Sequence, residues 1–225
     1  MNSRKILVAL LLIIPFSYLY GLPILSLEID MEDAFITPLS IFISLLFNVI
    51  ILAGFSILCI YVLYDGGIKH VFYRLYFRRK KAPESILIGM LSSILFLFLI
   101  GALLYFLQLI GYDISNPLAE KIIEKLTLPL LFAIPFLSAL SEETFFRGFL
   151  LMHFPKKYGK IIPLFITSFL FAIAHLSYGN LLQIIIPFIL GIFLGILMLY
   201  EKNLIAPLSA HFAFNFIQLA LAMYQ

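Results

Sequence analysis

The stretch TLPLLFAIPFLSALSEETFFRGFLL, residues 127–151, decides how this chain is interpreted. It is apolar and long enough to cross the hydrocarbon core of a membrane, which takes about 17 to 25 residues. It nevertheless carries Glu142, Glu143 and Arg147 within about a turn and a half of helix. An ionised side chain in the middle of a membrane-spanning helix costs roughly 2.5 to 3.5 kcal/mol on insertion scales. Three such groups together indicate a functional site rather than a passive span.

The composition of the whole chain places it in a membrane. Of its 225 residues, 63% are hydrophobic and 12% are charged, and the mean hydropathy is +1.10. Soluble domains carry about 25% charged residues. The sequence therefore predicts an all-α, polytopic transmembrane helical bundle that forms a single membrane domain over residues 1–225. No phosphate-binding loop or nucleic-acid module is visible, so we expect membrane lipids and no nucleic acid as partners.

Apolar runs along the chain give the number of membrane spans. We expect about seven, at residues 6–27, 36–64, 85–112, 127–151, 160–177, 180–200 and 204–223. The fifth run is the shortest, and the fourth is interrupted by the charged cluster.

The distribution of basic residues predicts the orientation. If the N-terminus is cytoplasmic, all but two of the fifteen lysines and arginines fall on the inner side, Lys121 and Lys125 being the exceptions. Basic residues are enriched in cytoplasmic segments of membrane proteins. We therefore expect a cytoplasmic N-terminus and an outer C-terminus, in the plasma membrane of a prokaryote. Nothing in the sequence sets an oligomeric state.

The charged cluster divides into a pair and a spare acid. Glu143 and Arg147 stand four residues apart, so they share a helix face in the favoured order for an ion pair. Glu142 is rotated by about 100° from Glu143, so the two carboxylates cannot use Arg147 equally well. One carboxylate is left in a low-dielectric environment, where it is suited to act as a general base.

Three further polar groups of catalytic type lie downstream in apolar surroundings. His175 ends the run FLFAIAH, and His211 and Asn215 stand four residues apart in HFAFN. Each alone is most simply explained as a satisfied core residue or as a contact between helices. Together with a spare carboxylate, however, two histidines and an asparagine can activate a water molecule and stabilise an oxyanion.

The three motifs EExxxR, FxxxH and HxxxN resemble those of the CPBP family of intramembrane proteases. They read Glu142–Arg147, Phe171–His175 and His211–Asn215 here, in the family's order. The family includes the type II CAAX prenyl endopeptidases and bacterial relatives in bacteriocin processing or immunity. The resemblance covers residues 127–223 as the catalytic helices, whereas residues 1–112 carry no motif. It implies an endopeptidase acting on a membrane-bound peptide or a lipid-modified, CAAX-like protein.

The resemblance also implies a role for each site residue. Glu142 would deprotonate water, which His175 helps to hold, and His211 and Asn215 would donate to the oxyanion. Glu143 and Arg147 would support the polar network. We expect no cofactor; the alternative is zinc held by Glu142, His175 and His211. A zinc site commonly has three protein ligands and a water, but no HExxH sequence is present.

Two other functions fit parts of this pattern. A non-enzymatic immunity or scaffold member could keep the fold, and a proton-coupled transporter could use Glu142 and the histidines as a relay. Depth along the helices also raises a difficulty, because His175 is about 22 Å from Lys160 whereas His211 is only about 10 Å from Leu204 at 1.5 Å per residue. We therefore expect the last helix to begin deep in the membrane, and a polar cavity to open to the cytoplasmic side.

Overall fold

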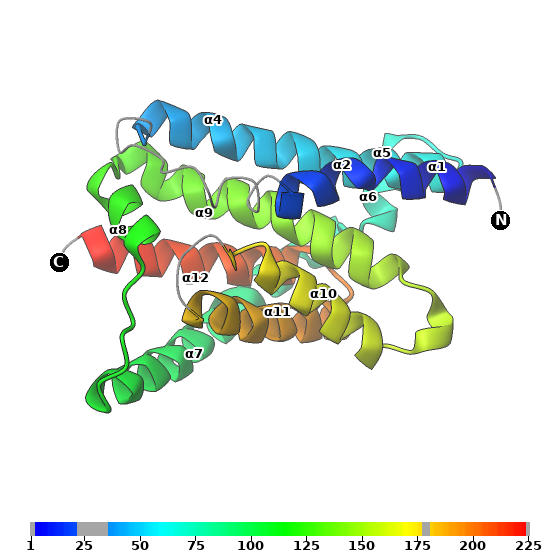
Figure 1. Ribbon diagram of the computed structural model, residues 1–225. Helices are drawn as coiled ribbons and strands as arrows, with labels where there is room; N and C mark the ends of the chain where they lie inside the picture. The colour runs from blue at the N-terminus through cyan, green and yellow to red at the C-terminus, as the bar shows by residue number, and fades with distance from the viewer. Residues whose placement is uncertain (1–2, 22–35, 177–180, 224–225) are drawn as a thin grey trace.

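The computed structural model describes residues 3–21, 36–176 and 181–223, and within these ranges the chain is helical with no strand (Figure 1). The first half contains α1 (Ser3–Leu11), α2 (Ile13–Phe16), the π-helix η1 (Ser17–Gly21), α4 (Pro38–Asn48), the π-helix η3 (Val49–Gly54), α5 (Phe55–Leu63), α6 (Ile68–Arg74), the short 3₁₀ helix η4 (Arg79–Lys81) and α7 (Ala82–Leu109). The second half contains α8 (Pro117–Glu124), α9 (Leu128–Glu142), the π-helix η5 (Glu143–Leu151), the 3₁₀ helix η6 (Lys156–Tyr158), α10 (Ile161–Ile173), α11 (Leu182–Glu201) and α12 (Ile205–Met223). The predicted all-α membrane bundle is confirmed.

Within the described residues, six helical stretches are long and apolar enough to cross a membrane. They are Ser3–Gly21, Pro38–Leu63, Arg79–Leu109, Leu128–Leu151, Leu182–Glu201 and Ile205–Met223. The span predicted at 160–177 is instead the 13-residue helix α10, which reaches only about 20 Å at 1.5 Å per residue. The seven predicted spans are thus six long segments and one shorter apolar helix.

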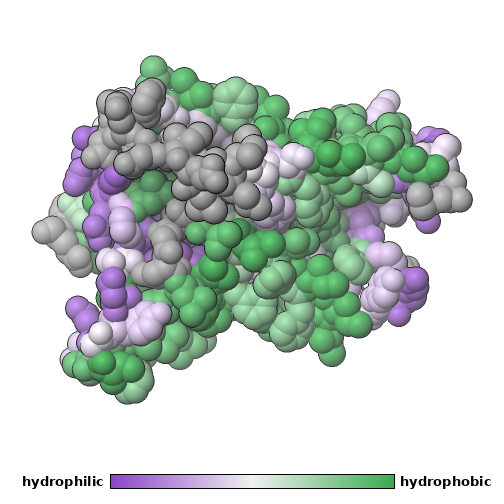
Figure 2. Space-filling view, in the orientation of Figure 1, coloured by the Kyte–Doolittle hydropathy of each residue, from purple (hydrophilic) through white to green (hydrophobic). Residues whose placement is uncertain are grey.

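The two ends of the bundle differ in what they carry. The start of α1 lies at one end with the η5–α10 connection, and the C-terminal end of α12 lies with α8 at the other (Figure 1). We call these the α1 end and the α8 end. Hydrophobic side chains cover the middle of the surface in Figure 2, and hydrophilic side chains gather at both ends. This distribution fits a helical bundle whose middle section lies in the hydrocarbon core of a membrane.

Small residues allow two helix pairs to pack closely. A Cβ on Gly89 of α7 would meet Ser209 and the Ala206 carbonyl of α12. A Cβ on Gly191 of α11 would lie 3.0 Å from Ser168 Cβ of α10. Membrane helices use such small residues because lipid provides no hydrophobic drive for their association. The GxxxG spacing of Gly191 and Gly195 is typical of such close helix contacts.

The turn between α11 and α12 is buried inside the bundle. Asn203 and Leu204 have no exposed surface. The Asn203 side chain donates to Ser85 Oγ at 2.8 Å, and the Leu204 N–H donates to the Tyr76 carbonyl at 2.9 Å. The last helix thus begins inside the bundle, and this places His211 of α12 at the level of α9 and η5. Its depth in the membrane stays a prediction.

Candidate active site

The charged cluster lies where α9 passes into the π-helix η5. Glu143 and Arg147 are both buried, their side chains being 0% and 2% exposed, and Arg147 Nη1 donates to Glu143 Oε1 at 2.9 Å. Desolvated charges of this kind are stable only when they are paired. The predicted Glu143–Arg147 pair is therefore present, in a segment where a π-helix replaces the α-helix. π-helical turns are often found at functional sites.

The second terminal nitrogen of the Arg147 guanidinium binds a backbone carbonyl on another helix. Its Nη2 donates to the Gly191 carbonyl of α11 at 3.2 Å, and the guanidinium lies 4.5 Å from the ring centre of Phe171 on α10. Arg147 thus links three helices around the cluster.

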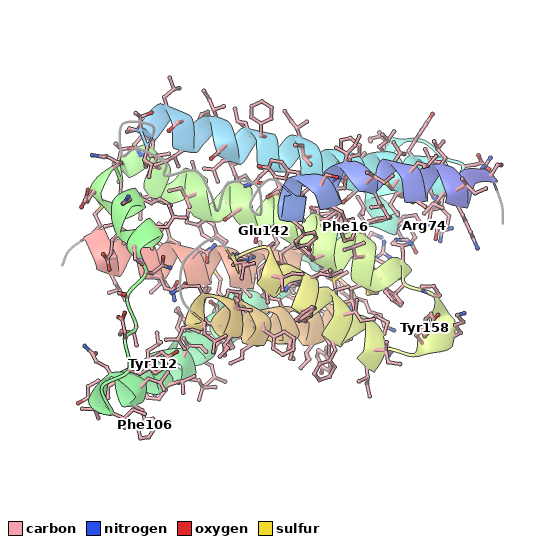
Figure 3. The ribbon with its side chains drawn as sticks, in the orientation of Figure 1. Phe16, Arg74, Phe106, Tyr112, Glu142 and Tyr158 are labelled. Atoms are coloured by element: carbon pink, nitrogen blue, oxygen red, sulfur yellow. The ribbon has the colours of Figure 1, made fainter. Side chains whose placement is uncertain are left out.

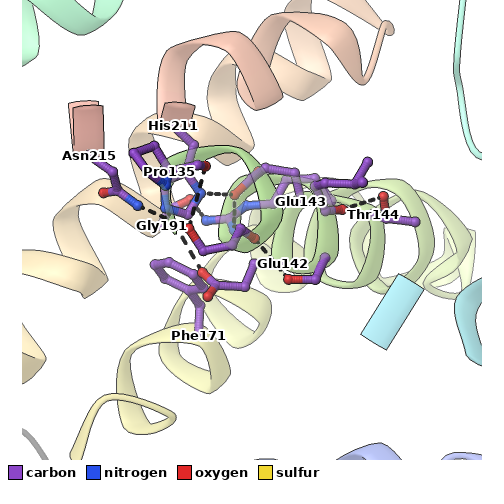
Figure 4. Close-up of polar contacts among 12 residues, drawn as sticks. Pro135, Glu142, Glu143, Thr144, Phe171, Gly191, His211 and Asn215 are labelled. Atoms are coloured by element: carbon purple, nitrogen blue, oxygen red, sulfur yellow. Dashed lines mark hydrogen bonds and ion pairs between the residues drawn. The ribbon is translucent and has the colours of Figure 1, made fainter. Parts of the chain in front are cut away.

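His211 connects the two carboxylates. Its Nδ1 lies 2.8 Å from Glu143 Oε1, and its Nε2 lies 3.9 Å from Glu142 Oε2 (Figure 4). An ionised carboxylate only accepts hydrogen bonds, so Nδ1 carries the proton and donates to Glu143. The ring is thereby oriented with Nε2 toward Glu142. Glu142 is the less buried acid, with a side chain 17% exposed.

His175 is oriented in a similar way by a backbone carbonyl. Its Nδ1 donates to the Phe171 carbonyl at 2.9 Å, one turn earlier in the chain. In the neutral ring this leaves Nε2 unprotonated. His175, Glu142 and His211 all line one cavity.

Asn215 lies one turn after His211 on α12 and lines the same cavity. Its side-chain nitrogen donates to Ser138 Oγ at 3.4 Å, and Ser138 donates in turn to the Ile134 carbonyl at 2.6 Å. Ser138 stands four residues before Glu142, so both face this cavity from α9. All four residues predicted to be catalytic are therefore brought together, as Figure 4 shows for three of them.

The cavity has a volume of about 470 Å³ and extends from this cluster toward the α8 end. Figure 3 shows Glu142 near the middle of the bundle, with Tyr112 near the α8 end and Arg74 and Tyr158 toward the α1 end. The walls are mostly aliphatic, and uncharged polar side chains line the cavity beyond the cluster, namely Ser44, Asn48, Asn116, Gln183 and Gln218. The described lining contains no lysine, arginine or aspartate.

The described lining of the cavity runs from the charged cluster toward the α8 end, away from the start of α1. On the α1 side of the cluster, the buried α11–α12 turn with Asn203 and Leu204 packs inside the bundle. The cytoplasmic N-terminus and the cavity open to the cytoplasmic side both stay predictions.

Comparison with known proteins agrees with this arrangement. A family model described as type II CAAX prenyl endopeptidase Rce1-like matches residues 124–217, which hold all the cluster residues. The chain belongs to the CPBP family. An uncharacterised 24.3 kDa protein of Escherichia coli is 30% identical over 175 residues, which cover 67% of this chain and 80% of the relative. No solved structure matches the chain. The chain is thus a multi-pass membrane protein of a peptidase family.

The arrangement of His and Glu side chains in this CPBP protein bears on the zinc alternative. Zinc takes nitrogen and oxygen ligands at about 2.0 to 2.2 Å in a tetrahedral arrangement. Among the residues that the structure describes, no three His, Cys, Asp or Glu side chains are placed to hold a metal. Glu142, His175 and His211 share the cavity without forming such a set, so they do not fit the zinc alternative.

Two parts of the CPBP site were not predicted. Ser138 holds Asn215, and the Gly191 carbonyl holds Arg147. The spacing of Ser138 from Glu142 was visible in the sequence and could have pointed to Ser138. The role of Gly191 could not be predicted, because a residue's type does not show what its backbone carbonyl binds.

Proposed function

We propose that the protein is an intramembrane endopeptidase that hydrolyses a peptide bond of a membrane-bound or lipid-modified substrate with water activated by Glu142. The proposal depends on the different surroundings of the two carboxylates. Glu143 is fully buried and accepts from both Arg147 and His211, whereas Glu142 lines the cavity and is in part exposed. A general base must reach water, and of the two acids only Glu142 meets this condition.

In the proposed reaction, Glu142 accepts a proton from water while the water oxygen attacks the carbonyl carbon of the scissile bond. A tetrahedral oxyanion forms. Glu142 then gives the proton to the leaving nitrogen, and the C–N bond breaks to release an amine and a carboxylic acid. His175 supports this step because it lines the same cavity as Glu142, where its ring can help to hold the attacking water.

The charges of the cluster favour His211 as a donor to the oxyanion. Two ionised carboxylates and Arg147 sum to one negative charge, which an imidazolium at His211 balances. In this form Nδ1 donates to Glu143 at 2.8 Å and Nε2–H is available to the oxyanion. When the proton of water moves to Glu142, the negative charge moves to the oxyanion. The net charge of the cluster and the oxyanion together therefore stays the same. One such donor is worth about 2.7 to 4 kcal/mol in soluble proteases.

Asn215 supplies a second donor to the oxyanion. Its bond to Ser138 is long, at 3.4 Å, and its side-chain nitrogen has two hydrogens. One can stay with Ser138 while the other binds the oxyanion. Because His211 and Asn215 stand one turn apart on α12, both can reach the same oxygen atom.

The substrate of the protein is best tested by the peptide ends that it produces. Membranes from cells expressing the wild type, Glu142→Gln or the control Glu124→Gln would be compared by mass spectrometry of new peptide termini. Glu124 lies exposed on α8, outside the cavity. We expect membrane-proximal termini that are shared by the wild type and Glu124→Gln and absent with Glu142→Gln. Identical sets of termini in all three samples would contradict the proposal.

A further inference from the structure

We infer that a second cavity, at the α1 end of the bundle, binds one anionic phospholipid of the surrounding membrane. The cavity has a volume of about 520 Å³ and is lined by residues of α1, of the end of α5 and of the end of η5 (Figure 1). It shares no lining residue with the active-site cavity. One wall belongs to η5, the π-helix that also carries Glu143 and Arg147.

The polar lining residues of this second cavity lie at the ends of three membrane spans. Counting the six long spans along the chain, Lys5 lies in the first turn of the first span, and Tyr64 directly follows the second. His153 follows the fourth span by two residues. The headgroup region of a bilayer begins where such apolar spans end. The polar side of the cavity is therefore at the depth of lipid headgroups.

The apolar lining residues extend the second cavity to the depth of lipid chains. Val8 and Leu12 line it from the first span, and Phe149 and Leu150 line it from the fourth. Leu12 is seven residues beyond Lys5, which is about 10 Å at 1.5 Å per residue. A ligand that fills this space needs a polar head and a hydrocarbon chain, as a phospholipid has.

The charge of the lining favours an anionic headgroup. Lys5 is the one lysine or arginine among the described lining residues, and no aspartate or glutamate is among them. Its ammonium forms no ion pair with a described residue, whereas the neighbouring Arg4 is held by Asp65 at 2.9 Å. Arg74 adds positive charge nearby, because its guanidinium lies 4.2 Å from the ring centre of Tyr64. Basic pockets between membrane helices bind anionic lipid headgroups.

The other two polar lining residues form an uncharged pair. The Nε2 of His153 donates to the Arg74 carbonyl, and its Nδ1 accepts from the Tyr64 hydroxyl, each at 3.1 Å. Lys5 thus provides the single formal charge of the lining. A phosphodiester headgroup such as phosphatidylglycerol carries one negative charge, whereas a phosphate monoester carries about −1.5 to −2 at pH 7. The lining therefore matches a singly charged lipid, and a zwitterionic lipid would bring a cation close to Lys5 and Arg74.

Native mass spectrometry of the full chain in detergent tests the inference without any assay of activity. The protein would be titrated with phosphatidylglycerol, with phosphatidylcholine of the same acyl chains, or with sn-glycerol 3-phosphate, and the Kd of the first adduct would be measured. Lys5→Gln removes the cation of the cavity, and Leu12→Trp fills its apolar part. The matched control is Lys69→Gln, which removes an exposed cation on α6, outside the cavity.

We expect the wild type and Lys69→Gln to bind phosphatidylglycerol at least fivefold more tightly than phosphatidylcholine, and to give no adduct with sn-glycerol 3-phosphate. Lys5→Gln should reduce the preference to within twofold, and Leu12→Trp should weaken phosphatidylglycerol binding at least fivefold. Should Leu12→Trp fail to fold, the comparison of Lys5→Gln with Lys69→Gln still decides.

Three results would overturn the inference. Equal affinity of the wild type for the two lipids would remove the role of headgroup charge. Equal losses in Lys5→Gln and Lys69→Gln would show a general attraction of lipid to the basic surface. A glycerol phosphate adduct as tight as that of the lipid, or a folded Leu12→Trp protein with full lipid affinity, would show that no acyl chain enters the cavity.

Discussion

His211 donates its Nδ1–H to Glu143 Oε1 at 2.8 Å, and the same oxygen accepts a hydrogen bond from Arg147 at 2.9 Å. One buried oxygen atom thus orients a histidine on α12 and neutralises a guanidinium on η5. The other oxygen, Oε2, has no hydrogen-bond partner among the described residues. Glu143 is a positioning residue in this arrangement, and it leaves the neighbouring Glu142 for chemistry.

The two acids should therefore differ in their effect on stability. Glu143→Gln removes the charge that compensates buried Arg147, and breaking a buried pair costs about 3 to 5 kcal/mol. Glu142→Gln removes no hydrogen bond between described residues, only the 3.9 Å contact of a partly exposed carboxylate with His211, and should change stability by less than about 1 kcal/mol. Thermal unfolding in detergent would compare the two variants. Equal losses of stability would contradict the separate roles.

Replacing Gly191 should impair catalysis through Arg147. Its added Cβ would lie 3.1 Å from Ser168 Cα and 3.3 Å from the Ser168 carbonyl, so α11 must shift and carry with it the carbonyl that holds Arg147. We expect Gly191→Ala to lower kcat at least tenfold. Gly101→Ala on α7 is the matched control, because no atom lies within 4 Å of its added Cβ. It should leave kcat unchanged and alter stability by at most about 1 kcal/mol. Equal kcat values in both variants would argue against the role of Gly191.

His153 should make the protein sensitive to acid. It follows η5 just outside the membrane span, where its Nε2 donates to the Arg74 carbonyl and its Nδ1 accepts from Tyr64, each at 3.1 Å. Burial is the main cause that lowers the His153 pKa below its ordinary value of 6.5, and the nearby Arg74 charge adds to it.

The unfolded chain therefore binds the His153 proton more readily than the folded protein. The stability that this group contributes is present above about pH 6.5 and is lost as the pH falls through the folded pKa. Thermal unfolding at pH 7.5 and 5.5 should show a smaller loss for His153→Gln than for the wild type. An identical loss in both proteins would contradict this assignment.

The part of the cavity beyond the charged cluster predicts that cleavage depends little on a C-terminal carboxylate of the substrate. No lysine or arginine lines the cavity within the described part of the chain, and the polar side chains beyond the cluster are uncharged. A carboxylate held there, away from His211, has no cation to bind. Peptide substrates that differ only in a C-terminal acid or amide should be cut at rates within about threefold. A preference for the acid above about tenfold, worth about 1.4 kcal/mol, would contradict this expectation.

Much of the site could be predicted from the sequence because it depends on spacing within single helices. Glu143 and Arg147 form their pair four residues apart, and His211 and Asn215 line the same cavity from one helix. Local spacing and helical geometry were sufficient for these features.

The remaining features depend on packing between distant segments. The end at which the cavity lies follows from the contacts of Asn203 and Leu204 with residues 76–85, which no local pattern reveals. The π-helical turn at η5 and the carbonyls of Gly191 and Phe171 that hold Arg147 and His175 are backbone features. Side-chain identity contains little information about them.

The central claim is that Glu142 activates water, and turnover of Glu142→Gln tests it most directly. The variant, the wild type and the control Glu124→Gln would be reconstituted in liposomes with one membrane-anchored peptide that the wild type cleaves. We predict that Glu142→Gln lowers kcat at least a thousandfold, about 4 kcal/mol of transition-state stabilisation, while Glu124→Gln stays within twofold of the wild type. A Glu142→Gln enzyme with kcat within tenfold of the wild type would contradict the account.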